Sequence, residues 1–153
     1  MTTLHPALLI FAMALSACAP PSRPVEQPKL EPTAEAWYPE TIQKLAAMNR
    51  DAETLFQSGN FDEAGAIVTK AQPLENRLLS VPRPTLPAME AASDLDDLYG
   101  RMLLRNRQYG WARDFFQKNV IRWKTWKPQT PDTERRWKQA AAAVAACDRD
   151  LAK

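Results

Sequence analysis

Apolar side chains recur at intervals of three and four residues from about residue 40 to the end of the chain. This spacing places them on one face of a helix, and no segment alternates with the two-residue period of a strand for long. The first apolar stripe consists of Ile42, Leu45, Met48, Ala52, Leu55 and Phe56. The pattern predicts an all-α domain of about five antiparallel helices over residues 40–153.

Glycine and proline divide the first half of this pattern. Gly59 suits the left-handed end of the first helix, and Asn60 followed by Glu63 predicts a capping box at the start of the second. Pro73 is expected to kink or end that second helix, because proline lacks a backbone N–H. Three prolines within residues 80–87 then predict a loop.

The second half of the domain predicts three further helices. A third helix follows the loop and ends in a turn at residues 105–108, and a fourth ends before Pro128. Thr130 followed by Pro131 is typical of an N-cap and a first helical residue. These two residues predict the start of the last helix.

Residues 1–17 are expected to form a signal peptide. The apolar run Ala7–Ala17 has the length of a signal-peptide core and is too short to span a bilayer. Residues 15–18 read Leu-Ser-Ala-Cys, which resembles the lipobox of bacterial lipoproteins. The resemblance implies diacylglyceryl transfer to the Cys18 thiol, cleavage before Cys18, and acylation of the new N-terminus. The alternatives are an ordinary signal peptide with a chance cysteine and a buried N-terminal helix.

Residues 18–39 are expected to form the lipidated cysteine and a tether. Their prolines disrupt helices and sheets and favour an extended, polyproline-like chain. These prolines are Pro20, Pro21, Pro24, Pro28, Pro32 and Pro39. Ala19 is not the aspartate that retains many lipoproteins in the inner membrane. The resemblance therefore implies the periplasmic face of the outer membrane in a Gram-negative bacterium.

The composition argues against most enzymes. The 153 residues include 4 Gly, 2 Cys and 1 His, and no two glycines have the spacing of a phosphate-binding loop. His5 lies in the predicted signal peptide, so the processed chain lacks the commonest general base and zinc ligand. We expect no catalysis, no cofactor and no metal. The remaining enzymatic alternative is a carboxylate-only mechanism using Glu90, Asp94, Asp96 or Asp97, which also suit the acidic first half of a helix.

After processing, Cys147 would be the remaining free thiol. Its alanine-rich helical surroundings predict a small buried hydrophobe. An intermolecular disulfide in an oxidising compartment is the alternative.

Residues 52–71 and 100–119 share one pattern. Each has a small residue, an aliphatic residue three positions later, a turn, an aromatic residue and then alanine. This order resembles the tetratricopeptide repeat, in which small residues lie where two helices cross closely. The resemblance implies two helical hairpins followed by a capping helix that begins at Pro131.

The two units also depart from that family. The aromatic residues Phe61 and Tyr109 are 48 positions apart, more than the usual period of about 34. Arg107 occupies the place of the turn glycine Gly59, and Asp51 stands where the family prefers a large apolar residue. An unrelated five-helix bundle with the same spacing is the alternative.

Tetratricopeptide arrays bind partners in a groove lined by the first helix of each unit. The resemblance places in that groove Asn49, Glu53, Phe56, Arg101, Leu104 and Arg105. Arg101 and Arg105 lie one turn apart and suit a partner's carboxylate, although Arg101 is equally placed to pair with Asp97. The first hypothesis is therefore a membrane-anchored adaptor that binds another envelope protein.

Charge is divided unequally along the chain. Residues 19–97 hold 7 basic and 13 acidic side chains, whereas residues 98–153 hold 13 basic and 5 acidic ones. A basic and aromatic patch is predicted from Arg122, Trp123, Lys124, Trp126, Lys127, Arg135 and Arg136. The second hypothesis is direct binding of an anionic envelope polymer or lipid there. Alternatively, the tryptophans belong to the core. We expect no nucleic acid partner, because a lipid-anchored protein rarely meets one.

Overall fold

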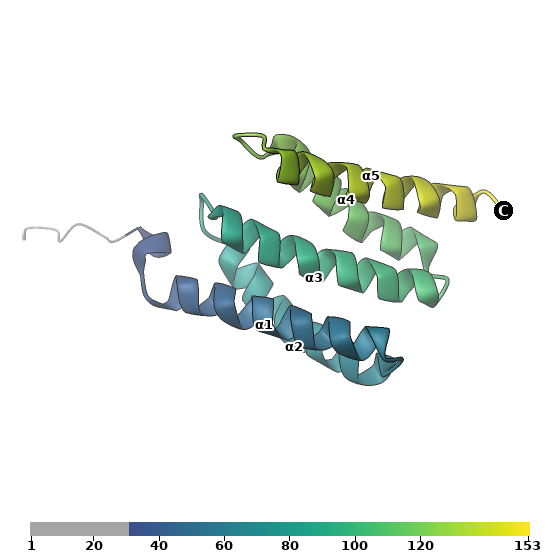
Figure 1. Ribbon diagram of the computed structural model, residues 1–153, viewed down its shortest axis with the longest axis horizontal. Helices are drawn as coiled ribbons and strands as arrows, with labels where there is room; N and C mark the ends of the chain where they lie inside the picture. The colour runs from purple at the N-terminus through teal and green to yellow at the C-terminus, as the bar shows by residue number, and fades with distance from the viewer. Residues whose placement is uncertain (1–30) are drawn as a thin grey trace, which may run out of the picture.

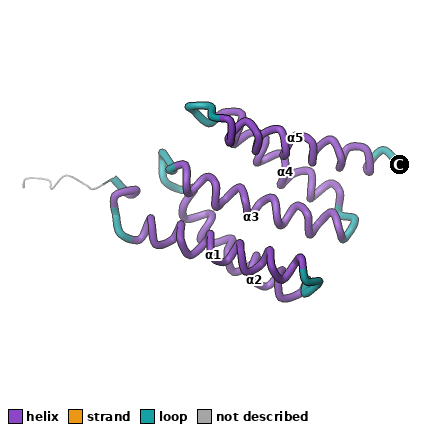
Figure 2. The backbone as a smooth tube through the Cα atoms, in the orientation of Figure 1, coloured by secondary structure: helices purple, strands orange, loops and turns teal. Residues whose placement is uncertain are grey.

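The computed structural model describes residues 31–153 and confirms the all-α class. A 3-10 turn (Pro32–Ala34) precedes the α-helices, which are α1 (Trp37–Gln57), α2 (Phe61–Leu79), α3 (Leu86–Arg105), α4 (Tyr109–Thr125) and α5 (Pro131–Leu151). The described part of the chain contains no strand (Figure 2). The predicted signal peptide, the lipidation site Cys18 and most of the predicted tether lie outside the described residues.

The five helices form two layers. Helices α1, α3 and α5 lie in one layer, and α2 and α4 lie behind them (Figure 1). Successive helices pack against each other, and α1 also contacts α3. The start of α1, the α2–α3 loop and the α4–α5 loop lie at one end of the molecule, which we call the tether end (Figure 1). The other two turns and the C-terminus lie at the opposite end.

The first helix begins earlier than predicted. Helix α1 starts at Trp37 and includes Pro39, so the prediction that Pro39 belongs to an extended tether is wrong. Pro39 lies in the first turn, where a backbone N–H has no acceptor within the helix, so no hydrogen bond is lost. Tyr38 is buried, and its hydroxyl accepts a hydrogen bond of 2.9 Å from the backbone N–H of Thr85. This contact holds the first turn against the start of α3.

The start and the end of helix α2 both differ from the predictions. It continues through Pro73 to Leu79, so Pro73 does not end it, and Glu75 and Leu78 beyond the proline are buried. Asn60 is the N-cap residue, but its side chain makes no capping hydrogen bond, so the capping box predicted there is wrong. Its ψ of 66° is not the extended conformation that aims an N-cap side chain at the first turn.

The predicted cap of α5 is confirmed. Thr130 has an extended backbone, and its hydroxyl accepts a hydrogen bond from the backbone N–H of Thr133. The Thr133 hydroxyl accepts one in return from the backbone N–H of Thr130, at 2.8 Å. Pro131 occupies the first turn. The reciprocal bonds satisfy two donors that a helix start would leave free.

The α1–α2 and α3–α4 turns have the same geometry, 48 positions apart. Gly59 and Arg107 have positive φ angles of 87° and 57°. The next backbone N–H in each turn donates a 2.9 Å hydrogen bond to the carbonyl five residues earlier, at Leu55 and Leu103. Arg107 therefore takes the left-handed conformation that the first turn gives to a glycine. The turns of the two helical hairpins therefore share one backbone geometry.

Apolar residues from every helix form the core. The larger cluster joins α1, α2 and α3, and it includes Tyr38, Leu45, Ala52, Val68, Leu78, Leu95 and Leu98. A smaller cluster joins α3, α4 and α5, and it consists of Leu103, Ala112, Phe116 and Cys147. Cys147 is completely buried and free, which confirms the prediction of a small buried hydrophobe.

Gly100→Ala is expected to lower the free energy of unfolding by about 1–3 kcal/mol, although alanine is the better helix former by about 1 kcal/mol. A Cβ atom at Gly100 would lie 2.6 Å from the Phe116 ring, which is itself buried. Urea unfolding measures the change. The matched control is Gly110→Ala, where a Cβ would meet nothing within 4 Å. Equal effects of the two substitutions would contradict a close helix crossing at Gly100.

Candidate functional site

A hollow of about 600 Å³ lies between helices α1 and α3. A second hollow of about 370 Å³ lies between α3 and α5. Asp94 and Asp97 of α3 line both, so the two hollows lie side by side on the layer of α1, α3 and α5. We call the two hollows together the front depression. Its other polar lining residues are Asn49, Arg50, Glu53, Thr54, Arg101, Ser93, Asn119, Arg135, Arg136 and Gln139.

Ion pairs cross the front depression between neighbouring helices. Arg101 binds Asp97 at 2.8 Å and Glu53 of α1 at 3.0 Å. Its hydrogen bond to Glu53 is the main reason that the pKa of this carboxyl is lowered. Arg136 of α5 binds Asp94 at 2.7 Å. These pairs hold α1 and α5 to α3. They also engage Glu53 and Arg101, which the sequence analysis had assigned to binding a partner.

Arg50 and Asn49 also line the front depression, and neither takes part in these ion pairs. Arg50 is exposed and makes no ion pair with any described residue. Asn49 is buried, and its Nδ2 donates a 2.7 Å hydrogen bond to the carbonyl of Ala91. The Asn49 Oδ1 atom is buried without a hydrogen-bond partner. A buried acceptor without a donor is uncommon in folded proteins.

The six predicted groove residues are divided among three places. Asn49, Glu53 and Arg101 line the front depression. Phe56 and Arg105 line a separate hollow at the end opposite the tether, where the Arg105 guanidinium lies 3.3 Å from the centre of the Phe61 ring.

Leu104, the sixth predicted groove residue, packs against the smaller core cluster instead. Arg101 and Arg105 therefore do not form one clamp for a carboxylate. Arg101 takes the alternative partner, Asp97.

The predicted basic and aromatic patch is wrong for Arg122 and Trp123. Trp123 is completely buried, and its indole N–H donates a 2.8 Å hydrogen bond to the Ser93 hydroxyl. Arg122 is also buried and belongs to an ion cluster described below.

The other five members of the patch are not buried. Arg135 and Arg136 both bind Asp132, and Arg136 also binds Asp94. Lys124, Trp126 and Lys127 make no ion pair with a described residue, and they lie at the tether end.

A buried ion cluster joins α2, α3 and α4, and sequence reasoning missed it. Arg122 of α4 lies 2.9 Å from Asp96 of α3 and 3.6 Å from Glu75 of α2, and it also donates to Asn119. Lys118 lies 3.8 Å from Asp96, from the solvent side. Burial, and then the nearby Asp96 carboxylate, raises the pKa of Glu75 to about 7. Burial also raises the pKa of Asp96, while Arg122 and Lys118 oppose that rise.

A sequence signal for this cluster existed. Glu75 follows Val68 and Ala71 on the buried face of α2 at helical spacing, and Arg122 follows Phe116 and Asn119 in the same way on α4. Charged residues on the core faces of separate helices indicate mutual pairing, because an isolated buried charge is very unfavourable.

Comparisons with protein-family models, curated proteins and solved structures found no match. Helices α1 to α5 include none long and apolar enough to cross a membrane. Within residues 31–153, no group of three or more histidine, cysteine or acidic side chains is arranged to hold a metal ion.

Proposed function

We propose that this protein is a lipid-anchored envelope adaptor that binds a second protein in the front depression. The observation that carries the proposal is that the two hollows adjoin at Asp94 and Asp97 of α3, because a surface shared by α1, α3 and α5 fits an extended protein segment. The repeated hairpin turns, 48 positions apart, support the tetratricopeptide-like reading. The lipobox-like residues 15–18 support the anchor.

The chemistry of the front depression favours a polar protein segment. Its lining carries both signs of charge and side-chain amides, so a partner with mixed charge finds complementary groups. The exposed Arg50 is a cation that lines the depression and that a partner's carboxylate can bind without breaking an ion pair within residues 31–153.

Arg50→Glu is expected to reduce recovery of the partner at least about tenfold, by replacing an attraction with a repulsion at the depression. The measurement is quantitative co-purification from detergent-solubilised membranes. Arg50 is a better choice than Arg101, whose reversal would also break the bonds to Glu53 and Asp97.

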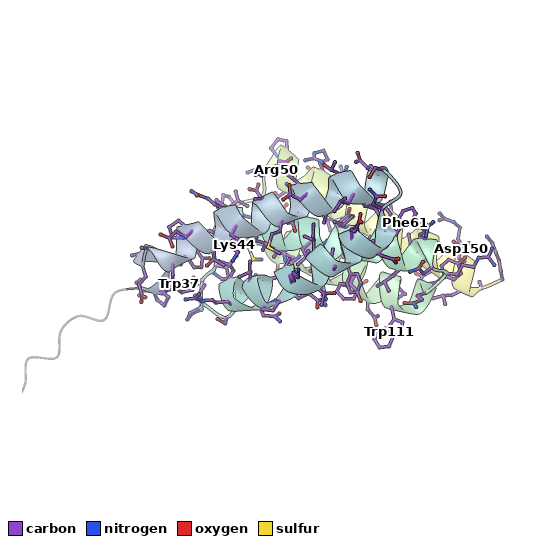
Figure 3. The ribbon with its side chains drawn as sticks, turned by 90° about the horizontal axis from the view of Figure 1, so that it is seen from below. Trp37, Lys44, Arg50, Phe61, Trp111 and Asp150 are labelled. Carbon is purple, nitrogen blue, oxygen red and sulfur yellow. The ribbon has the colours of Figure 1, made fainter. Side chains whose placement is uncertain are left out.

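Lys70→Glu is the matched control, because Lys70 is exposed on α2 and makes the same change of charge. Arg50 projects from one side of the molecule and Trp111 from the opposite side (Figure 3). The adaptor proposal fails if a stoichiometric partner is recovered equally with both variants. It also fails if the unsubstituted protein recovers none.

A further inference from the structure

The tether end of the molecule carries three basic residues and one tryptophan. Arg83 lies in the α2–α3 loop, Lys124 lies in the last turn of α4, and Trp126 and Lys127 begin the α4–α5 loop. The antiparallel order of the helices brings both loops to the end where α1 begins (Figure 1). We call these four residues the tether-end surface.

The basic charges of the tether-end surface are free of acidic partners. Arg83, Lys124 and Lys127 are exposed, and none makes an ion pair with a described residue. Trp126 is half-buried, and its backbone carbonyl accepts a 2.8 Å hydrogen bond from the Gln129 side chain. That side chain also binds the Trp123 carbonyl at 2.7 Å, which fixes the loop to the end of α4.

Most acidic residues near this end are engaged by other side chains or lie on α1, and the exception is Glu31, which lines one hollow together with Arg83. Asp132 at the start of α5 binds Arg135 and Arg136, and Glu134 binds Lys138. On the α1 side, Glu35 accepts a 3.0 Å hydrogen bond from the Trp37 indole, and Glu40 lies in the first turn. The unpaired positive charge that has no acidic neighbour is therefore concentrated at the end of α4 and in the α4–α5 loop, on Lys124 and Lys127.

We infer that the tether-end surface docks on the anionic phospholipid headgroups of the membrane that holds the anchor. The inference rests on the proposed lipidation of Cys18. The 13 residues from Ala19 to Glu31 span at most about 45 Å when fully extended, so the domain stays close to the bilayer.

The chemistry of the surface fits this occupant. Unpaired lysine and arginine side chains are attracted to anionic headgroups within a Debye length, about 8 Å at physiological salt. Tryptophan favours the membrane–water interface. Docking this way stands the helices on the membrane and leaves the front depression open along its side.

The test uses the full lipidated protein in vesicles of phosphatidylcholine, with or without phosphatidylglycerol, whose acyl chains carry bromine. Bromine quenches tryptophan fluorescence at short range, and because the chain has five tryptophans, the part of the quenching that Trp126→Phe removes reports insertion of Trp126. We expect stronger quenching with phosphatidylglycerol, and loss of that excess in Lys124→Glu with Lys127→Glu and in Trp126→Phe. Flotation of the same vesicles reports the anchor.

The matched control is Lys44→Glu with Lys70→Glu, which changes the charge equally on exposed parts of α1 and α2. This control is expected to keep the excess quenching, and Cys18→Ser is expected to abolish flotation. Protein that floats without lipid-dependent quenching would overturn the inference and leave the anchor intact. Protein that does not float would overturn the anchor and the inference together.

The same outcomes separate lipid from cell-wall polymer. Binding of the unsubstituted protein to isolated sacculi, lost in Lys124→Glu with Lys127→Glu and accompanied by no excess quenching, would assign the surface to the polymer and overturn the inference.

Discussion

Arg122→Met is expected to lower the free energy of unfolding by about 3–5 kcal/mol at pH 8, because it removes the buried cation of two buried carboxyl groups and leaves only the exposed Lys118 near Asp96. Arg122 lies 2.9 Å from Asp96 and 3.6 Å from Glu75, and the three side chains are at most 10% exposed. Methionine fills the space of the arginine stem but supplies no charge. Urea unfolding at fixed pH measures the loss.

Two comparisons show whether the buried charge is the cause. Arg113→Met removes an exposed partner of Asp148 and is expected to change stability little, since exposed ion pairs contribute weakly. Adding Asp96→Asn and Glu75→Gln to Arg122→Met is expected to recover much of the loss, because no buried charge then remains unpaired. A triple variant as unstable as the sum of its substitutions would show that packing, and not charge, decides the effect.

The protein is expected to be more stable at pH 5 than at pH 8 by up to about 3 kcal/mol, through Glu75. The pKa of Glu75 is raised from 4.5 to about 7 by burial and by the Asp96 carboxylate. The folded protein therefore retains a proton between these two values that the unfolded chain has lost. This contribution is complete below pH 4.5 and disappears as the pH rises through 7.

Glu75→Gln is expected to flatten this pH dependence, because the amide is neutral throughout the range. The single histidine of the chain, His5, lies in the predicted signal peptide. Burial raises the pKa of the Cys147 thiol, so its ionisation does not contribute to this pH dependence. Urea unfolding of both proteins between pH 5 and pH 8 checks the prediction, and parallel curves would refute the assignment to Glu75.

The apolar spacing alone was sufficient to predict the helices, because each helix shows its buried face through residues three and four positions apart. Gly59 and the Thr130–Pro131 pair acted as local signals, and the structure confirms both. Pro73 and Asn60 were local signals too. The structure contradicts the capping box predicted from Asn60, and it shows that Pro73 does not end α2. Burial of the apolar Leu78 beyond the proline indicates that tertiary packing outweighs the local preference.

The candidate site was less predictable than the fold. The resemblance placed Asn49, Glu53 and Arg101 on one face, and they do line the front depression. Phe56, Leu104 and Arg105 belong elsewhere, because small rotations between helices decide which side of α1 or α3 faces a neighbour. Sequence spacing fixes the angle of a residue around its own helix and says nothing of the angle between two helices.

By itself, the sequence determined the helical class, the positions of the turns, the close crossing at Gly100 and the excess of basic residues in the second half. Only the tertiary structure decided which of these basic residues are paired. Arg122 entered a buried cluster with Glu75 and Asp96, whereas Lys124 and Lys127, within five positions of it, stayed exposed at the tether end. The physical reason is that the two members of a buried ion pair belong to helices that lie far apart in the sequence. Only the packing of those helices brings the two charged groups within reach of each other.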